Sequence, residues 1–427
     1  MTRIPLNDET QFALISGLWK GERGNLQPAR VLRGTNFAGD GLPDFEDVVE
    51  IQVEERHFES RSLKPGDIII ERSGGGPKQP VGRVALFLPP DEQSYFASNF
   101  TTAIRVVDRS VFEPEYVALY LQALYWDGAT ETLQRATTGI RNLDWREYLR
   151  FEIPACPLNE QKMLTRLIGG VRAAYRNEAR SYTTAFALKQ TTMRELFTRG
   201  LRGEAQKESE IGFVPESWSV VQIDRVATKT QYGLSIRGNA RGQLPILRMN
   251  CQVDGRVDFR DLQYVSIDSK TREAFVLRRG DLLFNRTNSI EHVGRMAIFD
   301  SDREAVFASY LIRLSVNQDF CDPQFLNYYM NQTSVQRDIK RYASRAVGQA
   351  NINASKLRTI EFPLPPTLNE QREIVAILDA IDRKIDLHKR KKAVLEELFR
   401  SLLHKLMTGE IRVSDLDLSA LPQEVTA

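Results

Sequence analysis

The sequence predicts a mixed α/β fold of two similar domains, each followed by one long helix, and two observations lead to this prediction. First, LNEQ occurs at 158–161 and again at 368–371, so the copies lie 368 − 158 = 210 residues apart. Second, other segments repeat at nearly the same shift: LKPGDIIIERSGGGPKQPVGRVALF from Leu63 resembles LRRGDLLFNRTNSIEHVGRMAIF from Leu277, and FASNFTTAIRV from Phe96 resembles FASYLIRLSV from Phe307. Ordered self-similarity of this kind indicates an internal repeat, here with a pseudo-two-fold relation.

Each copy is predicted to begin with a mixed α/β domain. Short β-like runs such as DIIIE and DLLF lie between Gly, Pro and Asn, and helical stretches follow from Glu115 and from Gln324. The predicted boundaries are 1–157 for the first domain, 158–203 for its helix, 212–366 for the second domain, 367–413 for its helix and 414–427 for a flexible tail. The start of the first domain is the least defined, because it lacks a P-x-x-W opening such as Pro215 to Trp218.

LNEQ is predicted to start each long helix. Thr367 and Glu370 have the spacing of a capping box, and Asn159 is the predicted cap of the first helix. Apolar residues then recur at steps of four and three, as in a coiled coil. The predicted helix-pairing residues are Leu164, Ile168, Val171, Tyr175, Leu196, Ile374, Leu378, Ile381, Ile385, Leu395, Phe399, Leu402 and Leu406. Both seams are polar in the middle. Three explanations stay open: the polar residues fix the register of the helices, they form a surface for a partner, or they are a solvated break that the pairing tolerates.

The two helices are predicted to run antiparallel. A helix of about 39 residues is roughly 60 Å long, whereas a domain of about 150 residues has a radius of gyration near 15 Å. A domain that small cannot easily return the chain along the whole helix. We therefore expect a dumbbell with one domain at each end of a helical pair.

Composition leaves DNA binding open and argues against a membrane or metal protein. The 427 residues carry a net charge of +2, and no stretch approaches the roughly 18 apolar residues of a membrane span. The opening MTRIPLNDETQFALI has no signal pattern, so a cytoplasmic protein is expected. Cys156, Cys251 and Cys321 form no CxxC pair and the four histidines lack ligand spacing, so no metal is expected.

Catalytic motifs are missing from the sequence. It contains no GxxxxGK[ST], no GxGxxG after a strand, no HExxH, no GxSxG, and no Asn/Asp-Pro-Pro-aromatic motif of adenine methyltransferases. SGGGPK at 73–78 faces TNSIEH in the second copy, which favours a variable turn over a phosphate cradle. The chain is therefore predicted to bind rather than to catalyse, and a diverged methyltransferase or nuclease is the less favoured enzyme alternative.

Basic charge is concentrated at 331–358, which predicts contacts with double-stranded DNA. This stretch has six basic residues and one acidic residue, a net charge of +5. Arg and Lys can hold phosphates while Asn and Gln reach base edges. Its counterpart in the first copy and the loops after Gly66-Asp67 and Gly280-Asp281 are further candidates. The predicted DNA-binding residues are Arg72, Lys78, Arg83, Arg135, Arg141, Asn142, Arg286, Asn288, Arg295, Lys340, Arg341, Arg345, Gln349 and Asn351. For any single arginine, a surface salt bridge is the alternative.

These features together resemble the specificity (S) subunit of type I restriction-modification systems. GFVPESWSVVQI at 212–223 and the closing run LNEQREIVAILDAIDRKIDLHKRKKAVLEELFRSLLHKLMTGEIRV carry the resemblance, which covers about 30–413. It implies two target-recognition domains that each read half of a bipartite DNA sequence, held apart by antiparallel helices.

The resemblance also implies partners in a host-defence complex. Two methyltransferase subunits and two restriction (motor-nuclease) subunits are expected, and S-adenosylmethionine, ATP and Mg²⁺ are expected on those partners. This subunit is expected to hold no cofactor and no catalytic residue, because the adenine to be methylated would flip into the partner's pocket. A coiled-coil interaction scaffold without DNA specificity is the alternative.

Overall fold

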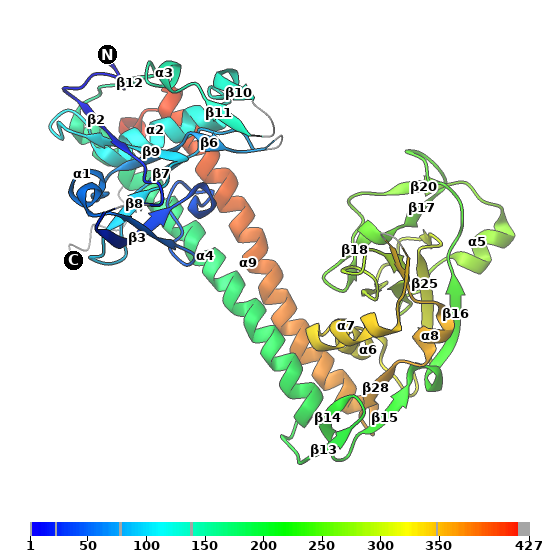
Figure 1. Cartoon of the computed structure of the whole chain (residues 1–427). Helices are drawn as coiled ribbons and strands as arrows, with labels where there is room; N and C mark the ends of the chain where they lie inside the picture. The colour runs from blue at the N-terminus through cyan, green and yellow to red at the C-terminus, as the bar shows by residue number, and fades with distance from the viewer. Residues whose placement is uncertain (1, 22–23, 77–78, 137–139, 347–348, 417–427) are drawn as a thin grey trace. The chain divides into compact units, whose positions relative to one another are not determined.

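The structure is a computed structural model that describes the chain except for residues 1, 22–23, 77–78, 137–139, 347–348 and 417–427. The chain forms two compact units, Met1–Ala179 with Arg390–Ala427 and Arg180–Lys389. Each long helix contributes to both units (Figure 1). The predicted mixed α/β fold is confirmed, since each unit combines small sheets with short helices and the ends of two long ones. No helix in the described part is long and apolar enough to cross a membrane.

The central sheets of the two units repeat one strand order. The first unit has the order β2-β9-β5-β7, formed by Phe12–Ser16, Thr101–Val106, Ile68–Glu71 and Val84–Leu86. The second unit has the equivalent order β16-β25-β21-β23, formed by Ala227–Tyr232, Leu311–Val316, Leu282–Asn285 and Met296–Ile298. There β19 (Arg256–Val257) and β18 (Gln252–Val253) extend the sheet to six strands. This shared order confirms the internal repeat.

A second sheet is also duplicated, and each copy contains one parallel pair. The first unit has the order β4-β3-β8, formed by Val49–Glu54, Leu26–Leu32 and Tyr95–Ala97. The second unit has the order β20-β17-β24, formed by Gln263–Val265, Leu244–Leu247 and Val306–Phe307. The parallel pairs are β3 with β8 and β17 with β24.

The first domain begins with a strand although it lacks the P-x-x-W opening. β1 (Arg3–Pro5) pairs with β12 (Glu152–Pro154), as β15 (Ser219–Gln222) pairs with β28 (Glu361–Leu364). In the second unit a hairpin of β13 (Gln206–Ser209) and β14 (Gly212–Pro215) precedes this strand.

Each central sheet is covered on both faces. Ile68 and Ile70 face a cluster with Tyr116 and Val117 of α2, whereas Ile69 faces the second sheet. Because neighbouring side chains in a strand point to opposite faces, burial of both faces explains the unbroken apolar run DIIIE. α6 covers the second unit's central sheet in the same way. The shorter helices are α1 (Phe58–Arg61), α2 (Pro114–Trp126), α3 (Trp145–Tyr148), α5 (Ser269–Phe275), α6 (Pro323–Met330), α7 (Thr333–Ile339) and α8 (Ala354–Arg358).

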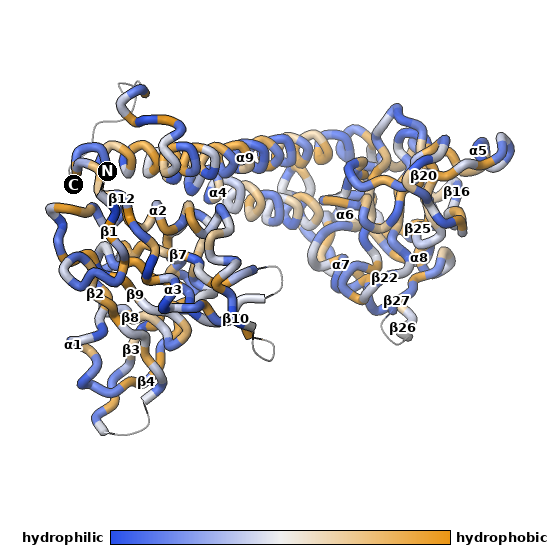
Figure 2. The backbone as a smooth tube through the Cα atoms, turned by 90° about the horizontal axis from the view of Figure 1, so that it is seen from above, coloured by the Kyte–Doolittle hydropathy of each residue, from blue (hydrophilic) through white to orange (hydrophobic). Residues whose placement is uncertain are grey.

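The two long helices are α4 (Leu158–Arg199) and α9 (Leu368–Thr408), and they run in opposite directions within each unit. In the first unit the start of α4, with Ile168, shares a core with Leu403 near the end of α9. In the second unit the end of α4, with Phe197, shares a core with Ile374 near the start of α9. Apolar and polar residues alternate along α9 (Figure 2). The antiparallel arrangement is therefore confirmed; the dumbbell stays a prediction.

Only some of the predicted helix-pairing residues are buried, so the buried positions agree only in part with the predicted heptad pattern. Leu164, Ile168, Ile374, Leu378, Ile385, Phe399 and Leu406 are buried, whereas Val171, Tyr175, Leu196, Ile381, Leu395 and Leu402 are only half-buried. Met193, Phe197 and Leu403, one position away from the frame, are buried instead. The reason is that the end of each long helix also packs on the globular domain of the unit in which it lies: Phe399 of α9 lies 5.5 Å edge-on from Trp126, and Phe197 of α4 lies 5.0 Å from Phe325.

The capping interactions at the starts of α4 and α9 differ from the predicted ones. The hydroxyl of Thr367 accepts a hydrogen bond from the Glu370 backbone N–H at 3.3 Å, but the Glu370 carboxylate accepts from Nε1 of Trp218 at 3.2 Å. Only half of the capping box therefore forms, because the buried indole competes for that carboxylate. The prediction that Asn159 caps α4 is wrong, since the helix already begins at Leu158.

Candidate nucleic-acid interface

Each unit carries a third, three-stranded sheet that joins segments predicted separately to bind DNA. In the first unit β10 (Gln134–Ala136), β11 (Arg141–Leu143) and β6 (Ser73–Gly74) form the order β10-β11-β6, here called the first small sheet. In the second unit β22 (Thr287–Asn288), β27 (Gln349–Asn351) and β26 (Ser344–Ala346) form the order β22-β27-β26, here called the second small sheet. The loop after Gly66-Asp67 thus pairs with the hairpin β10-β11, and the loop after Gly280-Asp281 pairs with the hairpin β26-β27.

Nine of the predicted DNA-binding residues lie on or next to these two sheets. They are Arg72, Arg135, Arg141 and Asn142 at the first small sheet, and Arg286, Asn288, Arg345, Gln349 and Asn351 at the second. Arg345 is placed by its backbone pairing with Ala350. Lys78 lies outside the described residues.

Arg72 and Arg286 occupy equivalent positions and are held in the same way. Each backbone carbonyl accepts a hydrogen bond at 2.8 Å, from the N–H of Leu143 and of Ile352 respectively. Each guanidinium lies over an aromatic ring, 4.9 Å from the ring centre of Trp145 for Arg72 and 4.6 Å from that of Tyr232 for Arg286. Burial lowers the pKa of Arg72. A stacked guanidinium is pre-organised, so it loses less freedom when it binds a base or a phosphate.

Two exposed aromatic side chains next to these arginines were missed by the sequence reasoning. The backbone N–H of Arg72 donates to the carbonyl of Phe100 at 2.8 Å, and that of Arg286 donates to the carbonyl of Tyr310 at 3.0 Å. Phe100 is 45% exposed and Tyr310 is 48% exposed. Both follow the shared tripeptide FAS, but Phe100 is the fifth residue of FASNF and Tyr310 the fourth of FASYL, so the sequence does not align them, and it does not show that they are exposed.

Asn142 and Asn351 are the equivalent amides of the two hairpins. The hydroxyl of Ser73 donates to Oδ1 of Asn142, and Nδ2 of Asn351 donates to the hydroxyl of Thr287 at 2.7 Å. Each bond joins residues that are also paired across strands. An amide oriented in this way suits the recognition of a base edge, to which Asn can bind through both of its polar atoms.

Two predicted DNA-binding arginines are engaged by carboxylates. Arg83 donates to Glu71 at 2.7 and 2.8 Å and to the carbonyl of Gly34 at 2.8 Å, and the Glu71 side chain is only 4% exposed. This buried ion pair gives Arg83 a structural role; its contact with DNA stays a prediction. Arg135 pairs with Asp144 but keeps 72% of its side chain exposed, and remains a candidate.

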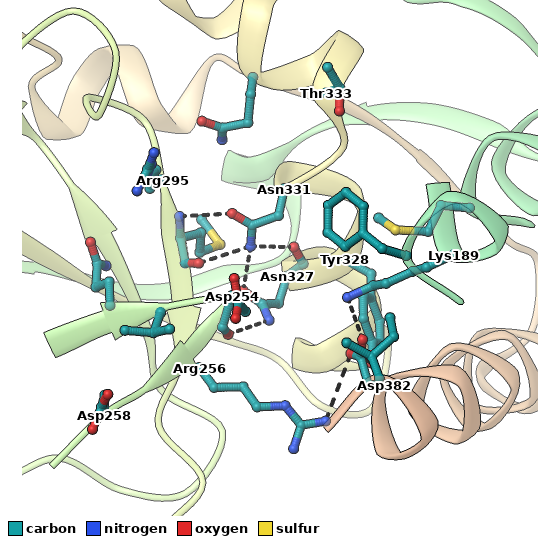
Figure 3. A pocket seen from close by; sticks show the side chains of 18 of the residues that line it. Lys189, Asp254, Arg256, Asp258, Arg295, Asn327, Tyr328, Asn331, Thr333 and Asp382 are labelled. Atoms are coloured by element: carbon teal, nitrogen blue, oxygen red, sulfur yellow. Dashed lines mark hydrogen bonds and ion pairs between the residues drawn. The ribbon is translucent and has the colours of Figure 1, made fainter. Parts of the chain in front are cut away.

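Two of the three other predicted cations of the second unit line a cavity of about 800 Å³ inside that unit (Figure 3). Arg295 and Lys340 lie on it, together with Arg337, and the α4 and α9 side contributes Lys189 and Asp382. Arg341 instead borders a smaller cavity of about 350 Å³.

Most polar groups on the helix side of the larger cavity bind one another. Nζ of Lys189 lies 2.6 Å from Oδ1 of Asp382, and the hydroxyl of Tyr328 lies 2.7 Å from carboxylate oxygens of both Asp379 and Asp382. Burial, followed by the hydrogen bond to Asp379, raises the pKa of Tyr328. Among the described residues, no cluster of three or more His, Cys, Asp or Glu could hold a metal ion. This side of the cavity is therefore a brace between domain and helices.

Comparison with known proteins shows similarity to one family over part of the chain. Residues 215–397 match the family described as Type I restriction modification DNA specificity domain. Over 205 residues, 47% of this chain, it is 32% identical to the putative type I restriction enzyme MjaX specificity subunit of Methanocaldococcus jannaschii, and the match spans 48% of that relative. This part of the chain is therefore similar to the type I DNA specificity domain.

Two longer matches extend beyond the family domain. The type I restriction enzyme StySPI specificity subunit of Salmonella potsdam is 26% identical over 378 residues, 83% of this chain and 76% of that relative. The crystal structure of the type I restriction-modification S subunit from M. genitalium shares the fold, with a TM-score of 0.58, 14% identity and 95% of both chains covered. The resemblance drawn from the sequence is thus confirmed.

Proposed function

We propose that this chain is a non-catalytic specificity subunit that reads a bipartite DNA target, with one half-site for each domain. The observation that carries the proposal is the pair of equivalent small sheets, each with a stacked arginine and a tethered asparagine. Between these shared elements the side chains differ: Ile140 and Arg141 in the first hairpin correspond to Gln349 and Ala350 in the second. Like scaffolds with unlike reading residues suit two different half-sites.

We further propose that α4 and α9 set the spacing of the half-sites and dock the catalytic subunits. The relatives are named as specificity subunits of type I restriction enzymes, which supports a place in a multisubunit complex. The resemblance implies two methyltransferase and two motor-nuclease partners in it. Exposed apolar side chains on α9, at Leu387, Val394 and Leu398, recur at helical spacing and offer a docking face. S-adenosylmethionine, ATP and Mg²⁺ would then belong to the partners.

The alternative of a coiled-coil scaffold without DNA specificity is not favoured. Residues 215–397 match a DNA specificity domain, and this range includes the second small sheet.

Methylome sequencing of cells that co-express the chain with its methyltransferase tests the assignment of one half-site to each domain. Asn142→Ala should relax or change only the first half-site, and Asn351→Ala only the second, because each amide sits in one domain. Arg345→Ala is expected to behave like Asn351→Ala. Equal damage to both half-sites by either variant would contradict the proposal and point to folding or assembly.

A further inference from the structure

The two units differ in charge at one equivalent place beside their small sheets. Arg83 and Arg295 match in the sequence repeat, and their backbones are bonded alike. The Arg83 carbonyl accepts from the N–H of Glu71 at 2.9 Å, and the Arg295 carbonyl accepts from the N–H of Asn285 at 2.8 Å. Asn285 therefore stands where the first unit has Glu71.

This replacement leaves Arg295 without the carboxylate that holds Arg83. Asn285 is 1% exposed, and its Oδ1 has no hydrogen-bond partner among the described residues. Arg295 is exposed, and no described carboxylate forms an ion pair with it. A buried ion pair in the first unit is thus exchanged for a solvent-facing cation in the second.

The segment that packs against the glycine before each of these arginines is also more basic in the second unit than in the first. A Cβ added to Gly82 would lie 2.9 Å from Thr130, and one added to Gly294 would lie 2.7 Å from Ile339, so Thr130 and Ile339 are seated alike. The residue after each is Glu131 in the first unit and Lys340 in the second. The counterpart of Arg337 in the first unit is Gly128.

Arg295, which is labelled in Figure 3, lines the cavity together with Arg337 and Lys340. Nε2 of Gln336 donates to the carbonyl of Gly294 at 2.8 Å and so ties α7 to the turn that precedes Arg295. The other four cations that line the cavity pair with carboxylates that also line it: Lys189 and Arg256 with Asp382, Arg260 with Asp258, and Lys389 with Asp254. The acidic residues nearby in sequence are Glu291 on the turn and Asp338, which is 3.7 Å from Arg337. Asp386 on α9 also lines the cavity. Arg337 thus has Asp338 as a neighbour, whereas Arg295 and Lys340 form no ion pair with any described carboxylate.

We infer that Arg295, Arg337 and Lys340 form a phosphate clamp on the second domain that the first domain lacks. The inference rests on the proposed function and adds that the two half-sites are held by unequal electrostatic contributions. Each phosphate contact makes log K fall with log salt by about 0.9, which is roughly 3.5-fold in affinity between 50 and 200 mM salt. Affinity for the second half-site therefore depends more steeply on salt than affinity for the first.

The test is a salt series of binding measurements on the full chain in complex with its methyltransferase subunits, using the cognate duplex found by methylome sequencing. Asn285→Glu installs the carboxylate of the first unit and should reduce the salt slope by about 0.9, because Arg295 is then paired. Lys340→Glu should reduce it by at least as much. Asn285→Gln, which adds no charge, is the matched control and should leave the slope unchanged.

A duplex that ends within the spacer, and so carries the first half-site alone, separates the clamp from general effects. Neither charge variant should alter the salt slope on that duplex. An unchanged slope on the full duplex for both charge variants would overturn the inference, as would an equal loss on the truncated duplex. Failure of the proposed function looks different: the wild-type complex would then bind cognate and scrambled duplexes alike at every salt concentration.

Discussion

The side-chain Oε1 of Gln371 accepts a hydrogen bond from the backbone N–H of Asp322 at 2.8 Å. Nε2 of Gln371 donates to the carbonyl of Phe320 at 3.0 Å. Gln161 makes the same kind of contacts in the first unit, accepting from Glu113 at 2.9 Å and donating to Val111 at 2.8 Å. The glutamine of each LNEQ therefore fastens a long helix to the loop that precedes the domain's own helix.

Replacing this glutamine should destabilise the unit that contains it. Gln371→Leu leaves the Asp322 N–H and the Phe320 carbonyl without their partner in a site where Gln371 is 1% exposed. Buried groups left unpaired cost about 1–3 kcal/mol each, so a loss of about 2 kcal/mol or more is expected. Urea unfolding measures it, with the exposed neighbour changed in Arg372→Gln as the control. A change no larger than the control's would contradict the fastening role.

The sequence reasoning predicted the repeat and the helix starts because these depend on local and periodic signals. It did not predict the role of Gln371, since a capping box concerns Thr367 and Glu370, and tertiary contacts with Trp218 and Asp322 override that local pattern. Met193 and Phe197 are buried one position after the predicted seam for the same reason, because α4 packs on α6 as well as on α9.

The candidate site was predictable in its parts but not in its assembly. Arg286 and Asn351 stood out as basic and amide residues in separate segments, and pairing of β22 with β27 brings them together. The ion pair of Arg83 with Glu71 was hidden, because the two residues lie 12 positions apart and nothing local marks them as partners.

Removing the carboxylate of Asp382 should weaken the attachment of the long helices in the second unit. Lys189 and Asp382 are only 13% and 12% exposed, so Asp382→Ala leaves a mostly buried ammonium without its counter-ion. Breaking a buried pair from one side costs about 3–5 kcal/mol. Asp386 lines the same cavity one turn further along α9, so Asp386→Ala is the matched control. It is expected to change the free energy of unfolding by less than about 0.5 kcal/mol. Equal urea midpoints for the two variants would show that the pair contributes nothing.

The ring of Tyr232 should matter more for DNA affinity than its hydroxyl. The ring lies beneath Arg286, whereas the hydroxyl accepts a hydrogen bond from the backbone N–H of Ala354 at 2.9 Å. Tyr232→Phe should retain affinity for the cognate duplex, and Tyr232→Leu should weaken it by about 2- to 30-fold, in line with a cation–π contact of about 0.5–2 kcal/mol. The comparison is made by titration at fixed salt, and a larger loss for Phe than for Leu would refute the stacking role.

The three cysteine thiols should resist modification in the folded chain. Burial, followed by the charge of Asp322, raises the pKa of Cys321 to about 12, and burial also raises the pKa of Cys156 and of Cys251. Because the thiolate is the reactive form, a disulfide reagent at pH 8 should label the native chain slowly and all three thiols quickly after unfolding in urea. Fast labelling of any thiol before unfolding would show that its surroundings are open to solvent.

The central claim is that the domains choose the half-sites while α4 and α9 set the distance between them. Its most direct test is methylome sequencing of a strain that expresses a variant shortened by one heptad in both helices, with the wild-type chain alongside. Seven residues correspond to about 10 Å of helix, or about three base pairs of DNA at 3.4 Å each. The account predicts unchanged half-sites and a spacer about three base pairs shorter. Altered half-sites with an unaltered spacer would contradict it.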